Sequence, residues 1–184
     1  MLPAAPPRAR LACAAVLAAL ACSPREVDPD SLRAAEVLRI HVEERTGAPV
    51  LLLRERDGSR VLPIWIGPAE ARAIAAALAG EIPPRPQTHD LARTLVETLG
   101  ARIEQVVVTE LREGTFYAEI HLARGGHRQV VDARPSDAVA LALRARRPIF
   151  VRSRLFDEAG GSVEEPPAER RPGKRARPGP RVET

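Results

Sequence analysis

The chain has 184 residues, enough for one domain of ordinary size with a tail at each end. Aromatic residues make up only 3% and the hydrophobic share of 45% is mainly Ala, Val and Leu, so we expect a core of small aliphatic side chains. The formal net charge of +4 is too small to mark the chain as a dedicated nucleic-acid binder.

The first residues have the pattern of a bacterial export signal. Two arginines precede an apolar run over Leu11–Ala21, and small residues lead up to Cys22. The run is shorter than the roughly 20 residues that span a bilayer. We predict a lipoprotein-type signal peptide over residues 1–21 and a tether over 22–35, with Cys22 lipidated as the membrane anchor. An ordinary cleaved signal is the alternative. The expected location is the bacterial cell envelope, facing the periplasm.

The folded domain is expected over residues 36–156. Alternation of apolar and polar residues indicates strands, and Ala-rich runs that follow a proline indicate helices. The first half contains strands over 36–44, 50–56 and 60–66, a helix over 69–79, and a helix over 90–99 capped by Thr88. The second half contains strands over 102–110, 115–123 and 127–132, a helix over 136–145 and a last strand over 149–152.

This order predicts an α+β single domain with two related three-stranded antiparallel meanders, each followed by helix. Pro68 and Pro135 start matching helices, and each is followed two residues later by an acid, Glu70 and Asp137. The repeat suggests internal duplication, although chance similarity of Ala-rich helices is an alternative. Residues 157–184 are rich in Pro and Arg and predict a disordered tail.

The densest polar chemistry lies at the predicted junction between the last meander strand and its helix. Asp132 and Arg134 are two residues apart on an extended segment, so we expect them on one face. Ser136 and Asp137 follow at the helix start, where orphan backbone N–H groups and the helix dipole favour them. The group is either a structural clamp or a site.

Four stretches of the chain resemble the bifunctional nuclease family. They are Leu62–Ala71, Arg85–Leu91, Gly114–Ala118 and Asp132–Ala138. The resemblance runs from about residue 36 to 156, and it implies DNase and RNase activity, which is attributed to some members. Typical members look cytoplasmic, so the predicted export signal and the basic tail are departures.

Phosphodiester hydrolysis requires an activated water and cations that neutralise charge at phosphorus. Carboxylate oxygens suit a divalent ion, and we predict Mg²⁺ or Mn²⁺ held by Glu70, Asp132 and Asp137. Arg134, with Ser136, is predicted to bind the substrate phosphate. The predicted catalytic residues are Glu70, His89, Asp90, Asp132, Arg134 and Asp137. Each has a structural alternative, as a helix-dipole partner, a salt bridge or a cap.

Two functions therefore remain open. The first is a nuclease acting on DNA, RNA or both, with or without the assistance of a divalent metal. The second is a non-enzymatic module, tethered to the envelope, that binds a ligand or a protein, favoured by near-neutral charge and scarce aromatics. We expect Trp65 in the core rather than as a stacking platform. Open sheet edges make a homo-oligomer plausible.

Overall fold

A computed structural model describes residues 31–162 of the chain, as one eight-stranded sheet with four helices. The elements, in chain order, are β1 (Leu32–Val42), β2 (Pro49–Glu55), β3 (Arg60–Trp65), α1 (Pro68–Leu78), α2 (Thr88–Thr98), β4 (Arg102–Arg112), β5 (Thr115–Arg124), β6 (His127–Ala133), α3 (Pro135–Ala145), β7 (Ile149–Arg152), α4 (Ser153–Glu158) and β8 (Gly161–Ser162).

The predicted α+β class and both meanders are confirmed. β1, β2 and β3 pair antiparallel in sequence order and are followed by α1, and β4, β5 and β6 do the same before α3. Short turns explain the local pairing. At the turn between β5 and β6, Gly125 and Gly126 have φ of +54° and +83°, a region that glycine enters without steric cost.

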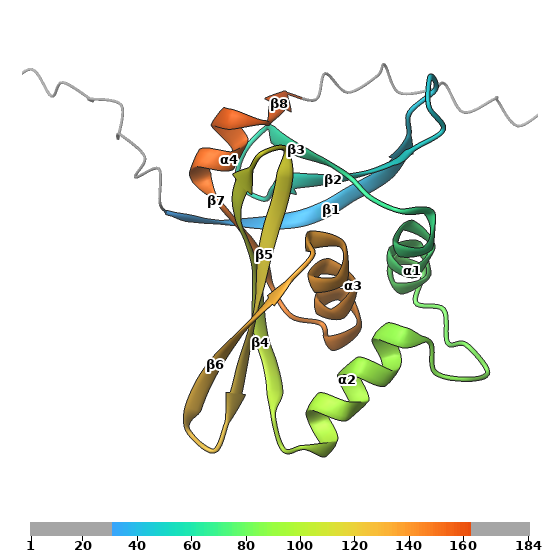
Figure 1. Cartoon of the computed structure of the whole chain (residues 1–184), viewed down its shortest axis with the longest axis vertical. Coiled ribbons are helices and arrows are strands. Elements are labelled where there is room, and N and C mark those ends of the chain that lie inside the picture. Colours follow the sequence, from blue (N-terminus) through green and yellow to red (C-terminus); the bar gives the residue numbers. More distant parts are fainter. Residues whose placement is uncertain (1–30, 163–184) are drawn as a thin grey trace, which may run out of the picture.

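β7 joins the two meanders into one sheet. The strand order is β6-β5-β4-β7-β1-β2-β3-β8, with β7 antiparallel to β1 and parallel to β4. Its sequence, Ile149-Phe150-Val151, is the continuous apolar run expected of a strand with neighbours on both sides. Figure 1 shows this strand passing between the two parts of the sheet.

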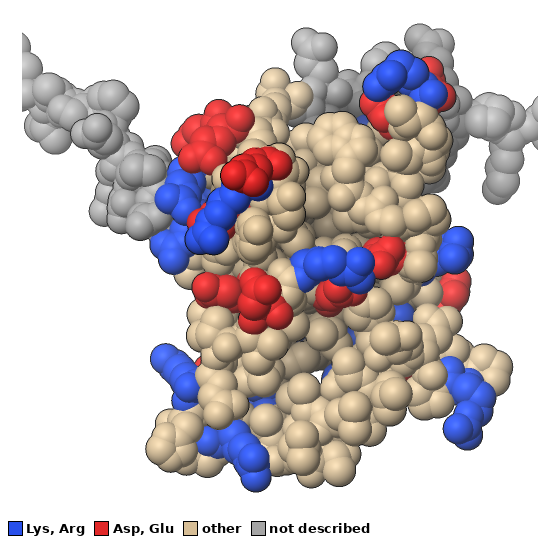
Figure 2. Space-filling model, viewed as in Figure 1, with Lys and Arg blue, Asp and Glu red and all other residues tan. Residues whose placement is uncertain are grey.

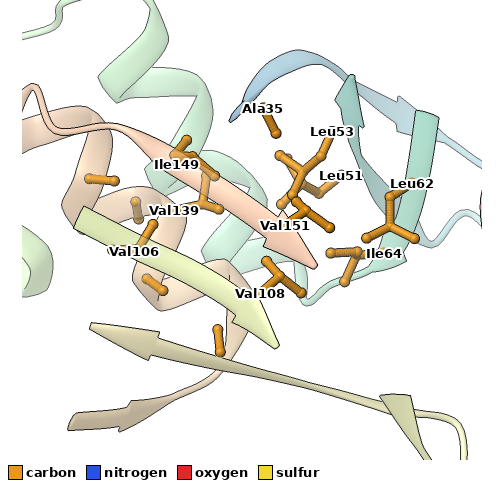
Figure 3. Close-up of a cluster of buried hydrophobic side chains, with 14 of the residues drawn as sticks. Ala35, Leu51, Leu53, Leu62, Ile64, Val106, Val108, Val139, Ile149 and Val151 are labelled. Atoms are coloured by element: carbon orange, nitrogen blue, oxygen red, sulfur yellow. The ribbon is translucent and has the colours of Figure 1, made fainter. Parts of the chain in front are cut away.

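One hydrophobic core is shared by both meanders. Leu51, Leu53 and Leu62 of the first meander are fully buried, as are Val106 and Val108 of the second. Figure 3 shows the side chains of β7 lying between these two groups. Full burial of an aliphatic side chain contributes about 1.5–3 kcal/mol, so this central contact is what makes the two meanders a single domain.

Three helices, α1, α2 and α3, lie together beside the sheet (Figure 1). The central one, α3, is the most buried, and Ala138, Val139, Ala140 and Ala142 are fully inaccessible. Small side chains at these positions let α3 approach β4 and β5 closely. The helix starts, which carry the polar residues of interest, are thereby fixed to a rigid core.

The ends of the domain differ from the sequence-based prediction. β1 begins at Leu32, within the predicted tether, because residues 32–35 pair with β7 and Ala35 is buried. At the other end α4 and β8 extend into the predicted tail. β8 pairs with the start of β3, and Asp157 accepts a hydrogen bond from Arg60, so residues 157–162 gain the pairing that the Pro/Arg composition argued against.

The predicted signal peptide (1–21) and Cys22 lie outside the described residues. Among residues 31–162, no helix is both long and apolar enough to cross a membrane. The predicted cap of α2 also differs: Gln87, not Thr88, is the N-cap, in a capping box with Asp90. Thr88 is already the first helical residue.

Candidate active site

The starts of three helices bring four polar side chains to one groove. Glu70 belongs to α1, His89 to α2 and Asp137 to α3, while Arg134 is the residue that precedes α3. These four residues, called here the acid–base cluster, line an open groove of about 1010 Å³. All four were predicted site residues, and the structure brings them together.

Asp137 is the centre of the cluster. Its Oδ1 lies 3.0 Å from Nε2 of His89, and its Oδ2 accepts a hydrogen bond of 2.6 Å from Nε of Arg134. Nη2 of Arg134 donates to Glu70 Oε1 at 2.9 Å and to Asp137 Oδ1 at 3.2 Å. Arg134 therefore connects the starts of α1 and α3, and Asp137 connects α3 to α2.

Local sequence explains why these side chains point into one groove. Pro68 and Pro135 are the first residues of α1 and α3, which places Glu70 and Asp137 at the same position in their helices. A Cβ at Gly67 would lie 2.2 Å from Oε2 of Glu70, so a larger residue there would displace the flexible end of the Glu70 side chain.

The helix starts also set the electrostatics of the groove. The cluster carries two carboxylates and one guanidinium, a formal charge of −1 when His89 is neutral. The amino-terminal ends of α1, α2 and α3 all border the groove, and each contributes a partial positive charge. Three converging dipoles offset the carboxylates and leave a site that an anion can approach.

Asp137 is held in its ionised form. Burial opposes its charge, but hydrogen bonds from Arg134 and His89 outweigh burial and lower the pKa of Asp137 from its ordinary value. At neutral pH the carboxylate is therefore an acceptor, and the His89 nitrogen that faces it carries a proton. In the neutral imidazole, this pairing selects the tautomer whose Nδ1 carries the lone pair.

The lowered pKa of Asp137 predicts a specific loss of stability in acid. Its stabilising contribution is complete above the unfolded pKa of about 4 and is lost as the pH falls through the lower folded pKa. We expect Asp137→Asn to lose less stability than the wild type between pH 5 and about 2. Urea unfolding at several pH values measures this. Parallel pH profiles for the two proteins would contradict it.

Asp90, a predicted catalytic residue, forms its hydrogen bonds with residues outside the acid–base cluster. Its Oδ1 accepts a 2.8 Å hydrogen bond from Nε of Arg144, and its Oδ2 accepts one of 3.0 Å from the backbone N–H of Gln87. Nη1 of Arg144 also donates to the carbonyl oxygen of Ala73 in α1, at 2.9 Å. Asp90 thus fixes the start of α2, and with it the neighbouring His89.

Asp132 lies apart from the cluster. It pairs across the sheet with Glu119, whereas the next pair, Ala133 and Ala118, points to the core. Because side chains alternate along a strand, Asp132 lies on the opposite face from the core. β6 ends at Ala133, so the expected shared face with Arg134 is not formed. In the described residues no hydrogen bond or ion pair joins Asp132 to the cluster.

The cluster as built does not fit a divalent ion. Among residues 31–162 no group of three or more His, Cys, Asp or Glu side chains is arranged to hold a metal. Glu70 and Asp137 belong to the predicted metal set, but the Arg134 guanidinium lies between them and donates hydrogen bonds to both. A metal ion at this place would have to displace the guanidinium from both carboxylates.

A second groove, not predicted from the sequence, adjoins the first. It has a volume of about 330 Å³ and is lined by residues from β3, the β4–β5 hairpin and the start of α3. Trp65 lies here and is 58% exposed, which corrects its expected place in the core. β8 covers only Arg60 and Val61 of β3, so the last residue of the strand is left at an open edge. Arg134 lines both grooves.

The surface around the site has no strong charge of one sign. On the face shown in Figure 2, basic and acidic groups form small separate patches, with no continuous basic stripe. Several basic groups are paired, as in Arg54 with Glu36 and Arg93 with Glu97. Any interaction with nucleic acid on this face must therefore depend on local geometry more than on net charge.

These features define an α+β protein with a candidate acid–base site where three helices begin. The chain belongs to the bifunctional nuclease domain family, because the family model matches residues 51–164, from β2 to just beyond β8. The matched range contains the whole acid–base cluster and both grooves.

Similar proteins occur in bacteria and plants. An uncharacterized protein of Mycobacterium tuberculosis is 50% identical over 124 residues, which are 67% of this chain and 74% of that protein. Bifunctional nuclease 1 of Oryza sativa is 31% identical over 128 residues, covering 66% of this chain and 39% of the rice protein. Bifunctional nuclease 1 of Arabidopsis thaliana is 27% identical over 129 residues, covering 68% of this chain and 40% of the plant protein.

Proposed function

We propose that this protein hydrolyses phosphodiester bonds in DNA, RNA or both, with His89 as general base. The observation that carries this proposal is the His89–Asp137 pair, which lies beside Arg134 in an open groove. The names of the rice and Arabidopsis relatives support the choice of nucleic acid as substrate.

His89 has the environment of a catalytic histidine. Its side chain is 13% exposed, and its only hydrogen bond in the described residues is to Asp137 through Nε2. The ionised Asp137 orients the ring and stabilises the imidazolium that forms when Nδ1 accepts a proton. The proton comes from a water molecule or, in RNA, from a ribose 2′-hydroxyl, and the resulting oxygen nucleophile attacks phosphorus. The P–O bond to the leaving strand then breaks, and the departing oxygen takes up a proton from the imidazolium or from solvent.

Arg134 supplies the positive charge that the phosphate needs. Its Nε and Nη2 are held by Asp137 and Glu70, whereas its Nη1 makes no hydrogen bond in the described residues. The side chain is 66% exposed, so the Nη1 donors are accessible from the groove. A guanidinium fixed on one edge and open on the other is suited to bind phosphate oxygens as charge develops on them.

The test is cleavage of fluorescently labelled oligonucleotides by the full-length protein. Single- and double-stranded DNA and RNA are incubated with Mg²⁺, with Mn²⁺ or with EDTA. Cleavage that persists in EDTA supports the His89 mechanism, and cleavage that requires a divalent ion supports the metal assistance predicted from the sequence. Absence of cleavage in every condition would overturn the proposal.

Asp132→Ala is the control that separates the two predicted site arrangements. Because Asp132 lies on the other face of the sheet, we expect this variant to cleave within about twofold of the wild type. A loss as large as that of a cluster variant would instead return Asp132 to the catalytic set. A contaminating nuclease is recognised because it would be unaffected by every substitution.

A non-enzymatic binding module is the second candidate. It is favoured by the pairing of Arg134 with two carboxylates, which also fits a structural clamp between α1 and α3. In that case the protein binds oligonucleotides or another ligand without cleaving them, and the same assay, followed by binding measurements, distinguishes the two.

We propose a common origin for the two meander–helix units by internal duplication. The support is the equivalent position of Glu70 and Asp137, each third in a helix that begins with proline. Under this proposal the cluster formed when two copies of one helix start came to share Arg134. Alignment of many family members, half against half, tests it.

The cell-envelope location and self-association remain proposals from the sequence. Membrane fractionation of wild type and Cys22→Ser tests the lipid anchor, which should be lost in the variant. Sedimentation tests a homo-oligomer, for which β6 offers support as an edge strand whose residues 127–132 are all exposed.

A further inference from the structure

Trp65 has an unusual position for a large aromatic residue. The preceding residue of β3, Ile64, is 3% exposed and belongs to the core, whereas Trp65 is 58% exposed at the end of the strand. Its indole makes no hydrogen bond in the described residues. Exposed aromatic faces are the surfaces on which nucleic-acid binding proteins stack unpaired bases.

The groove beside Trp65 contains groups that complement a base. Phe116 of β5 contributes a second aromatic side chain to its lining. Ser136 also lines it and is 6% exposed as a residue, and its hydroxyl forms no hydrogen bond within the described part of the chain. The hydroxyl oxygen is not among the fully buried polar atoms that lack a partner, so a ligand donor or acceptor can reach it from the groove. The volume of about 330 Å³ is at the small end for ligand pockets.

The two grooves are adjacent because Arg134 lines both. A phosphate bound to Arg134 would therefore lie next to the groove that contains Trp65. In a single strand the base attached to that phosphate can rotate out and stack on an indole. In a duplex the base is paired and stacked within the helix, and extruding it costs a few kcal/mol.

We propose that the Trp65 groove is a nucleobase subsite and that the protein selects single-stranded nucleic acid. The base stacks on Trp65, its edge reaches the Ser136 hydroxyl, and its phosphate lies at Arg134. This proposal rests on the proposed function for the position of the phosphate, but binding and cleavage can be measured separately.

The experiment uses the fluorescence of Trp65, the only tryptophan in the chain. The full-length protein is titrated with a short single-stranded DNA, the same strand in a duplex, and a strand of equal length with abasic positions. We expect saturable quenching with the single strand and little with the other two. Affinity measured by anisotropy should fall about tenfold in Trp65→Ala and much less in Trp65→Phe, because one stacked base contributes 1–3 kcal/mol.

Ile82→Ala is the matched control, since Ile82 is 94% exposed and lies outside this groove. It should leave affinity unchanged. Equal quenching by abasic and normal strands, or equal affinity of wild type and Trp65→Ala, would overturn the subsite. Quenching without any cleavage would overturn the proposed function and leave the subsite intact. Cleavage that is insensitive to substitution of Trp65 would overturn the subsite and leave the proposed function intact.

Discussion

Replacing His89 by alanine is expected to lower the rate of phosphodiester cleavage about 10²–10⁴-fold, the usual contribution of a general base. The neutral imidazole is the only group of the cluster that can offer a nitrogen lone pair, at Nδ1, while its Nε2–H donates to Asp137. Substrate affinity should change little, since Arg134 keeps both of its carboxylate partners. Steady-state cleavage with the best oligonucleotide substrate measures the rate.

Asp137→Asn is the companion variant. It keeps the size of the side chain but removes the charge that orients His89 and stabilises its protonated form. We expect a loss approaching that of His89→Ala, and no further loss in the double variant, because residues that act as a unit are not additive. Unchanged cleavage in both single variants, with folding intact by circular dichroism, would exclude the cluster as the catalytic centre.

The second large effect concerns stability. Arg144→Ala is expected to lower the free energy of unfolding by about 3 kcal/mol, because it leaves the carboxylate of Asp90 partly buried without its partner. The two side chains are only 9% and 22% exposed, and Arg144 also bonds to the carbonyl oxygen of Ala73. The substitution removes the links of α3 to both α2 and α1. Urea denaturation followed by circular dichroism measures it.

Arg93→Ala, in the helix that contains Asp90, provides the comparison. Arg93 pairs with Glu97 four residues on, with side-chain exposures of 36% and 52%. A pair of this kind contributes about 0.3–0.5 kcal/mol. If Arg144→Ala were as mild as Arg93→Ala, the α2 start would not depend on Asp90. Because His89 precedes Asp90, we also expect Arg144→Ala to slow cleavage without touching the substrate.

The local elements could be predicted from the sequence because their causes are local. The last strand was predicted over residues 149–152 and is found there, and the helix starts at Pro68 and Pro135 are within one residue of prediction. The insertion of β7 between β1 and β4 could not be predicted, because it depends on contacts between residues more than 100 positions apart.

The site was predictable to the extent that helix starts define positions. Glu70 and Asp137 were expected at equivalent helix starts and in one metal-binding set, and they line the same groove. Asp132 was expected on one face with Arg134 because the prediction assumed that the extended strand includes Arg134. The strand β6 ends one residue earlier, at Ala133. Trp65 was expected in the core because composition and alternation do not reveal that β8 stops short of it.

The position of β7 has a consequence for how the molecule forms during synthesis. Until residue 152 has left the ribosome, β1 and β4 each lack one neighbour, and the sheet that joins the two meanders is incomplete. We therefore expect the nascent chain to complete its fold in a late step, after its carboxyl-terminal quarter is made. Ribosome-bound chains that end before Ile149 should be cut readily by protease, and chains that include β8 should resist it.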